Sequence, residues 1–83
     1  MTASVRIIDF AFLPSSLSVR VGERVTWINR GMATHTVTAN GGLFNSGSLR
    51  PNQSFSFTFV SQGTYAYHCQ IHMSMTGTIT VRR

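Results

Sequence analysis

The sequence predicts an all-β protein, either a sandwich or a barrel, on three observations. Short runs rich in β-branched and aromatic residues alternate with clusters of glycine, proline, asparagine and serine. Several of these runs carry hydrophobic residues at every second position, which is the period of a strand with one buried face. No stretch shows the hydrophobic period of a helix, so the strands must supply the core.

The first half of the chain contains four candidate strands, at residues 4–10, 17–21, 24–29 and 35–39. The second of these alternates most clearly, because Leu17, Val19 and Val21 share one face. The sequence LPSS at residues 13–16 breaks the chain before it, and Gly22-Glu23 predicts a turn after it. The sequence RGMAT between the third and fourth strands predicts a loop.

The second half contains three further candidate strands, at residues 54–60, 64–69 and 77–82. Asn40-Gly41-Gly42 is a strong turn signal, and the segment that follows it, residues 43–49, reads as irregular. In SFSFTFV the three phenylalanines alternate with polar residues, which predicts a strand with one buried face.

The direction of the strands follows from one assumption, that Cys69 and His35 lie at the same end of the molecule. Cys69 ends its predicted strand, whereas His35 begins its own. The loops expected at that end are residues 13–16, 30–34, 50–53 and 70–76. The turns expected at the opposite end are residues 22–23, 40–42 and 61–63.

The length of 83 residues predicts one domain, residues 1–83, with one core. Hydrophobic residues make up 42% of the chain, which is too high for a disordered protein. A core this small gives limited stability, so a bound metal would add to it. The single cysteine excludes an internal disulfide, which leaves a buried hydrophobe, a free thiol or a metal ligand.

The formal charge of +5 comes from seven arginines set against Asp9 and Glu23. This sign favours an acidic partner or surface. The arginines are dispersed, and neither a basic helix nor zinc-finger spacing is present, which argues against nucleic-acid binding. No apolar run has the length of a membrane span, and MTASVRIIDF does not read as a signal peptide. A mature form, an excised domain and a cytosolic protein all fit this start.

The sequence YHCQIHMSM, residues 67–75, concentrates soft metal ligands. Cys69, His72 and Met75 form C-x2-H-x2-M, a short loop able to wrap one ion, and His35 would supply a fourth ligand from another strand. A trigonal plane of one thiolate and two imidazoles with a weak axial thioether is the blue-copper arrangement. Zinc rarely recruits a thioether, and iron–sulfur clusters need more thiolates.

The chain resembles the cupredoxins, most closely those of the amicyanin and plastocyanin type. The matching segments are VGERVTWINR, MATHTVT around His35, FSFTF and GTYAYHCQIHMSMTG. The resemblance implies an antiparallel Greek-key β-sandwich of about seven to eight strands. It also implies one type 1 copper held by His35, Cys69, His72 and Met75. The implied activity is transfer of single electrons by Cu(I)/Cu(II) cycling, without enzymatic chemistry.

Three positions depart from the family pattern. Thr36 stands where family members have the asparagine that ties the first histidine to the cysteine loop. Ile71 and Met73 stand where amicyanin-like loops carry prolines. The Thr36 hydroxyl is able to make a similar hydrogen bond, but the resemblance does not establish this brace, and the loop without prolines is open to greater mobility.

Two neighbours of the predicted ligands compete with them. Met73 is an alternative to Met75, but the spacing and the resemblance favour Met75 as the axial ligand. His68 faces away from Cys69 on a strand, and a second copper there would need more histidines than the chain holds. We therefore interpret His68 as structural. Trp27, the Phe55, Phe57 and Phe59 stripe, and the two tyrosines are expected in the core.

The loops at the predicted metal end offer an apolar patch around His72, with Leu13, Pro14, Met32, Ala33, Pro51, Ile71 and Met73. Arg30 and Arg50 would give it a sparse basic rim. We expect a monomer that meets donor and acceptor redox proteins with acidic docking surfaces, in the periplasm or another extracytoplasmic compartment. Two alternatives stay open: an electron-transfer module of a larger copper enzyme, and a copper carrier or sensor without a redox role.

Overall fold

A computed structural model describes residues 2–83, and within them the chain forms eight strands and no helix. The strands are β1 (Thr2–Ile8), β2 (Ala11–Leu13), β3 (Ser16–Arg20), β4 (Arg24–Asn29), β5 (Thr38–Ala39), β6 (Ser54–Thr58), β7 (Gly63–His68) and β8 (Thr76–Arg82). The all-β prediction is confirmed. Among these residues, no helix is long and apolar enough to cross a lipid bilayer.

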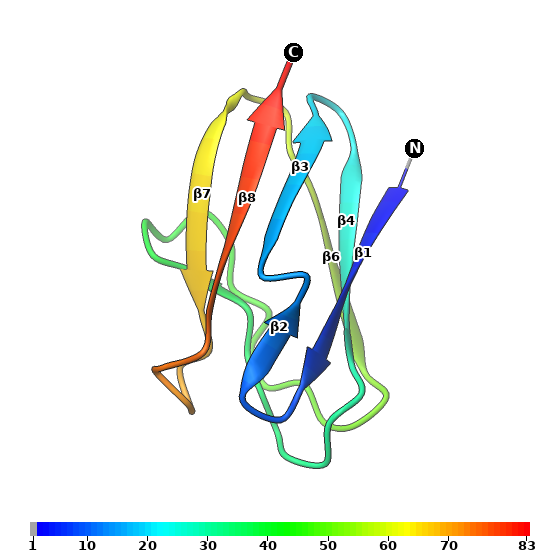
Figure 1. Ribbon diagram of the computed structural model, residues 1–83, viewed down its shortest axis with the longest axis vertical. Helices are drawn as coiled ribbons and strands as arrows, with labels where there is room; N and C mark the ends of the chain where they lie inside the picture. The colour runs from blue at the N-terminus through cyan, green and yellow to red at the C-terminus, as the bar shows by residue number, and fades with distance from the viewer. Residues whose placement is uncertain (1) are drawn as a thin grey trace.

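The strands run along the long axis of the molecule (Figure 1) and build two four-stranded sheets. One sheet has the order β2-β1-β4-β6, and the other has the order β3-β8-β7-β5. Hydrophobic residues alternate inward from both sheets. In β4, for example, Val25 and Trp27 are buried, and in β8 Ile79 and Val81 are buried. Of the sandwich and the barrel that the strand pattern left open, the structure is the sandwich that the resemblance implied.

Two strand pairs are parallel, which corrects the expectation of a fully antiparallel sandwich. β1 pairs with β4 and β3 pairs with β8 in parallel, whereas the other pairs are antiparallel. The chain leaves the first sheet after β2, forms β3 in the second sheet, and returns with β4 beside β1. Because the chain changes sheets between these neighbours, β4 re-enters in the direction of β1, and both sheets are mixed.

The short strand β2 was missing from the sequence prediction, and it changes what lies at the end of the molecule. β1 and β2 form an antiparallel hairpin with Ile7 opposite Phe12. The turn between them, Asp9-Phe10, therefore lies at the lower end in Figure 1, and the connection from β2 to β3 lies about midway up the sandwich. The loop at residues 13–16, expected beside the metal ligands, is displaced from that end, and Asp9 and Phe10 occupy it.

The segment from His35 to Gln53 is mostly irregular, as predicted for residues 43–49, but it still adds to the core. Only Thr38 and Ala39 form the strand β5, which is shorter than the predicted residues 35–39. His35 forms an isolated bridge with Leu49, and both residues are buried. Phe44 from the same segment is buried against Trp27, with ring centroids 5.7 Å apart. The segment therefore closes one side of the sandwich beside the predicted metal ligands.

Candidate metal centre

Cys69 directly follows the last residue of β7 at the lower end of the sandwich, and its side chain is fully buried. Two backbone N–H groups, those of Thr36 and His72, donate to its sulfur, each at 3.4 Å. The Cys69 N–H donates to the Met75 carbonyl at 3.1 Å, and the Met75 N–H donates to the His72 carbonyl at 2.9 Å. These bonds close the loop from Cys69 to Met75 and hold the thiol facing inward.

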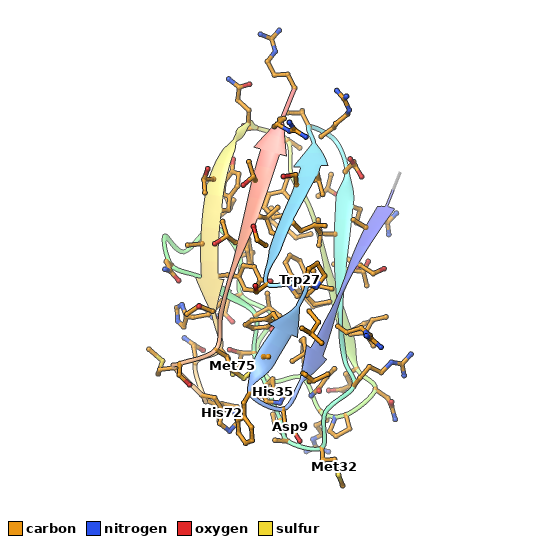
Figure 2. All side chains as sticks on the ribbon, in the orientation of Figure 1. Asp9, Trp27, Met32, His35, His72 and Met75 are labelled. Atoms are coloured by element: carbon orange, nitrogen blue, oxygen red, sulfur yellow. The ribbon has the colours of Figure 1, made fainter. Side chains whose placement is uncertain are left out.

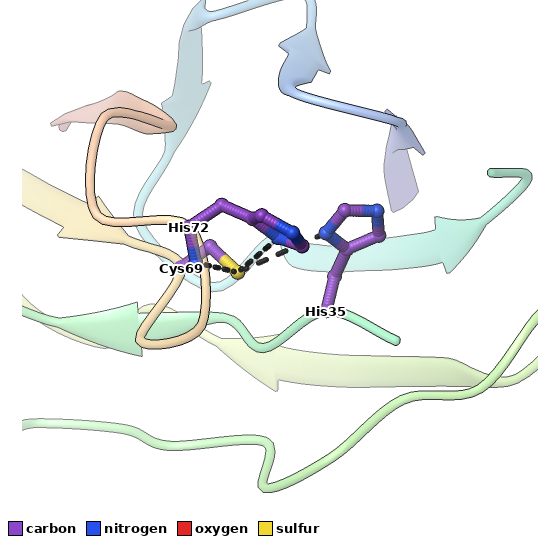
Figure 3. Close-up of side chains that lie close together, drawn as sticks. All are labelled: His35, Cys69 and His72. Carbon is purple, nitrogen blue, oxygen red and sulfur yellow. Dashed lines mark hydrogen bonds between the residues drawn. The ribbon is translucent and has the colours of Figure 1, made fainter. Parts of the chain in front are cut away.

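The two predicted histidines converge on the thiol (Figure 3). The His35 Nδ1 lies 3.8 Å from the Cys69 sulfur, and the His72 Nδ1 lies 3.9 Å from it. Cys69, His35 and His72 place one ligand atom each within 4.8 Å of one another. His35 is fully buried and His72 is half-buried, so only the second imidazole reaches the surface.

The separations match those expected around one metal ion. A sulfur about 2.3 Å and a nitrogen about 2.0 Å from one ion lie about 3.7 Å apart when the angle between them is trigonal. Both observed sulfur–nitrogen distances, 3.8 and 3.9 Å, are close to this value. The geometry of the three residues therefore fits an ion held in a plane between them, and the thiolate with two imidazoles suits copper.

Met75 and Met73 differ sharply in burial. Met75 is 1% exposed and lies at the lower end of the molecule, where Figure 2 also places His35 and His72, whereas Met73 is 66% exposed. A weak axial donor must face the interior of the site, and of these two thioethers only that of Met75 is buried. The assignment of Met75 as the axial ligand stays a prediction that its burial favours.

Thr36 supplies a brace at the position where family members have asparagine. Its backbone N–H donates to the Cys69 sulfur, and its hydroxyl oxygen accepts the Gln70 N–H at 2.8 Å. The residue is buried, so water does not compete for these bonds. A threonine therefore ties the segment of the first histidine to the cysteine loop in this chain.

His68 lies outside the cluster. Its Nδ1 lies 2.7 Å from the Asn40 Oδ1 on the outer side of β7, and the residue is half-buried. The cluster of Cys69, His35 and His72 does not include it, and no second cluster of three such ligands occurs within residues 2–83. Its placement agrees with the structural role predicted from strand parity.

Asp9 contacts the predicted ligand His35, and the sequence did not reveal this contact. Its Oδ1 lies 3.0 Å from the His35 Nε2, the ring nitrogen that faces away from the sulfur. The signal available in the sequence was composition: Asp9 is one of two acidic residues in the chain. Its pairing with His35 depends on the β1–β2 turn, which the sequence did not reveal.

Asn29 is a second missed contact, and it supports the loop that carries His35. It is fully buried at the end of β4, and its Nδ2 donates to the carbonyls of Ala33 and Leu49 at 2.9 and 2.8 Å. Its Oδ1 accepts the Gly31 N–H at 2.9 Å. The available signal was a polar residue at an inward-facing position of an alternating strand, after Val25 and Trp27.

The electrostatics favour a charged thiol and a charged carboxylate at neutral pH. Burial raises the pKa of Cys69, but N–H donation from Thr36 and His72 and contact with both imidazoles lower it to about 6, from an ordinary 9.0. Hydrogen bonds from His35 and from the backbone of Ala33 and Met32 lower the pKa of Asp9 to about 2. The site therefore offers a thiolate without needing a strong base.

The surface above His72 is apolar. Phe10 packs edge-on against the His72 ring with centroids 5.2 Å apart, and it is 67% exposed. Met32, Ile71 and Met73 are also exposed large hydrophobic residues from the loops at this end. We call Phe10, Met32, Ile71 and Met73 the His72 patch. Phe10 belongs to it in place of the predicted Leu13, because the β1–β2 turn occupies this end.

A family model described as a cupredoxin-like domain matches residues 1–81 of the chain. Amicyanin of Paracoccus denitrificans is 37% identical over 82 residues, which cover 93% of this chain and 63% of that protein. Plastocyanin of Scenedesmus fuscus is 34% identical over 84 residues, which cover 86% of each. A solved structure of the Cu(I) form of an amicyanin mutant superposes with a TM-score of 0.91 at 35% identity, covering 98% of this chain and 82% of that one.

Proposed function

Because the chain belongs to the cupredoxin family, we propose that it is a type 1 copper protein that carries single electrons between redox partners. The observation that carries this proposal is the approach of two imidazole nitrogens to one buried thiol, at 3.8 and 3.9 Å. Copper supplies a one-electron couple when bound in such a site. Like its amicyanin and plastocyanin relatives, the protein is an electron carrier. It is not an enzyme.

We propose His35, Cys69 and His72 as the three ligands in the plane and Met75 as the weak axial ligand. The two hydrogen bonds to the Cys69 sulfur hold the thiolate and reduce its electron density, which favours the reduced metal. The closed loop and the buried His35 hold the ligand positions before metal binds. A site that keeps one geometry in both oxidation states exchanges electrons with little reorganisation.

His72 is the proposed port for electrons, because it is the half-buried ligand and lies under the His72 patch. An apolar contact with a charged rim fits a brief redox encounter, in which charge steers approach and the interface stays small. Arg30 and Arg50 are exposed next to the segments that carry His35 and its bridge partner Leu49. We propose acidic docking surfaces on the donor and acceptor proteins, and a monomeric carrier between them.

We place the protein outside the cytoplasm, in the periplasm or an equivalent compartment. Reducing cytosol contains thiols that compete for copper, and a copper–thiolate carrier operates without this competition elsewhere. Fractionation of native cells with an antibody to the chain checks the location, and recovery only with cytosolic markers would contradict it.

The function is tested by adding Cu(II) to the apoprotein and recording the visible spectrum, the EPR spectrum and a voltammogram. We expect one copper per chain, an intense thiolate-to-copper charge-transfer band and a reversible one-electron wave. Cys69→Ser is the control, and it should remove the band while keeping the fold. A colourless copper complex, a blue Cys69→Ser variant or an irreversible wave would each contradict the proposal.

A further inference from the structure

The carboxylate of Asp9 makes four polar contacts with the segment that carries His35. Its Oδ1 lies 3.0 Å from the His35 Nε2 and accepts the Ala33 N–H at 3.0 Å, and both of its oxygens accept the Met32 N–H at 3.1 Å. Asp9 lies in the turn between β1 and β2, far in sequence from these partners (Figure 2). The Asp9 side chain therefore ties the β1–β2 turn to the loop that carries His35.

Gly31 shows that the loop is shaped around this carboxylate. A Cβ on Gly31 would collide with the Asp9 Oδ1 and would lie 2.9 Å from the Asp9 backbone nitrogen. The Gly31 N–H is itself fixed by the Asn29 Oδ1 at 2.9 Å, so the loop cannot easily move away. Only glycine leaves room for the carboxylate to reach His35 here.

The contact determines which nitrogen of His35 is free to bind metal. A carboxylate accepts, so the His35 Nε2 carries the proton and donates to Asp9. The Nδ1 is then unprotonated, and it is this atom that lies 3.8 Å from the Cys69 sulfur. A carboxylate behind a metal-binding imidazole fixes both its tautomer and its ring orientation.

The contact also places a negative charge behind the imidazole. The Asp9 side chain is 33% exposed, and its ionised form is held by three hydrogen-bond donors. The only other acidic residue, Glu23, lies in the turn between β3 and β4 at the opposite end of the sandwich. A negative charge near a metal favours the oxidation state with the larger positive charge.

We propose that Asp9 is a positioning residue of the copper site, which presents the Nδ1 of His35 to the metal and lowers the reduction potential by stabilising Cu(II) over Cu(I). The proposal rests on the proposed function. It predicts two separable effects of Asp9, one on the potential through its charge and one on the His35 ring through its hydrogen bond.

Asp9→Asn tests the charge, because an amide keeps the size of the side chain and one acceptor oxygen. We expect Cu(II) affinity to fall roughly tenfold relative to Cu(I), which raises the potential by about 59 mV. Glu23→Gln is the matched control, since it removes the same charge from the opposite end and should leave the potential almost unchanged. An Asp9→Asn potential equal to that of the control would overturn the proposal.

Asp9→Ala and Gly31→Ala test the positioning, and the tautomer is read in the apoprotein by long-range ¹H–¹⁵N NMR. We expect His35 to be protonated at Nε2 in the wild type and in Asp9→Asn, and to become a mixture of tautomers in Asp9→Ala. Gly31→Ala displaces the carboxylate without removing it. It should therefore also give a mixture of His35 tautomers and a raised reduction potential. An unchanged tautomer in Asp9→Ala would overturn the positioning role.

The two proposals fail differently. A wild-type protein without the blue band would contradict the proposed function, and the apoprotein tautomers would still report on Asp9. A blue, reversible wild type whose Asp9 variants match Glu23→Gln would leave the function intact and remove the role of Asp9.

Discussion

At the scale of single residues, burial separates the side chains that can serve the metal from their neighbours. Met75 and Met73 lie two positions apart, yet the first is 1% exposed and the second is 66% exposed. His72 and His68 also lie on one short segment, yet only His72 approaches the thiol. The same side-chain chemistry therefore has different roles according to the face on which the backbone places it.

Met75→Leu should leave a coloured copper site and raise the reduction potential. Leucine fills a similar buried volume, so the fold is retained, but the axial donor to Cu(II) is lost. We expect a shift of about 59 mV or more, which corresponds to a tenfold loss of preference for Cu(II). Met73→Leu is the control and should shift the potential far less, as measured by redox titration. A larger shift in Met73→Leu would reverse the axial assignment.

His68→Ala should keep one copper per chain and the wild-type visible spectrum. The change removes the contact between the His68 Nδ1 and the Asn40 Oδ1 at the surface, which costs about 1 kcal/mol of unfolding free energy or less. Metal analysis and denaturant unfolding measure the two effects. If this variant bound less copper than the wild type, His68 would be a metal ligand and its structural role would be wrong.

At the scale of elements, the pairing of β7 with β8 supports the strand that ends beside Cys69. Tyr67 lies opposite Gly77 in this antiparallel pair, two residues before the thiol. Its ring is fully buried and packs against Phe12, with centroids 4.7 Å apart. Gly77 makes room for the ring, because a Cβ at this position would overlap the Tyr67 ring and hydroxyl.

Gly77→Ala should therefore lower the free energy of unfolding of the apoprotein by about 1–3 kcal/mol, the usual cost of overpacking a core. Gly41→Ala is the control, because a Cβ on Gly41 would meet no atom within 4 Å. It should change stability by about 0.5 kcal/mol or less. Urea unfolding of both variants gives the comparison, and equal stabilities would show that the Tyr67 ring moves aside without cost.

At the scale of the whole molecule, the metal site and the stability of the fold are coupled through Cys69. The thiol has a pKa of about 6 in the folded protein and an ordinary 9.0 otherwise. Between these values the unfolded chain holds a proton that the folded chain has released. Stability therefore rises with pH in this window and is lost again as the pH falls through the folded pKa.

The apoprotein should thus become more stable from about pH 6 to about pH 9 by an amount that Cys69→Ser abolishes. Urea unfolding of both proteins across this range isolates the contribution of the thiol, because the other titrating groups are common to both. Thiolate absorbance in the ultraviolet should titrate with a midpoint near pH 6 in the folded wild type. Parallel stability curves for the two proteins would show that the folded thiol titrates at its ordinary pKa.

The sequence alone determined the features that are local. β4 occupies residues 24–29, as its alternation predicted, because the side on which each residue of a strand points is fixed by its position in that strand. Cys69 and His72 share one short loop, so their spacing already implied that they meet, whereas Met75 as the axial ligand stays a prediction. For Thr36 the sequence showed only a hydroxyl able to replace the family's amide, and the structure shows the bond that it accepts from the Gln70 N–H.

Only the tertiary structure decided the features that depend on distant partners. The parallel pairing of β1 with β4 arises because the chain changes sheets between them. The hydrophobic pattern of each strand does not show which sheet the chain enters next. β2 is three residues long, too short for alternation to reveal, yet it turns Asp9 toward His35 and Phe10 toward His72. Periodicity shows which face of a strand is buried, whereas contacts between distant segments depend on the packing of the whole chain.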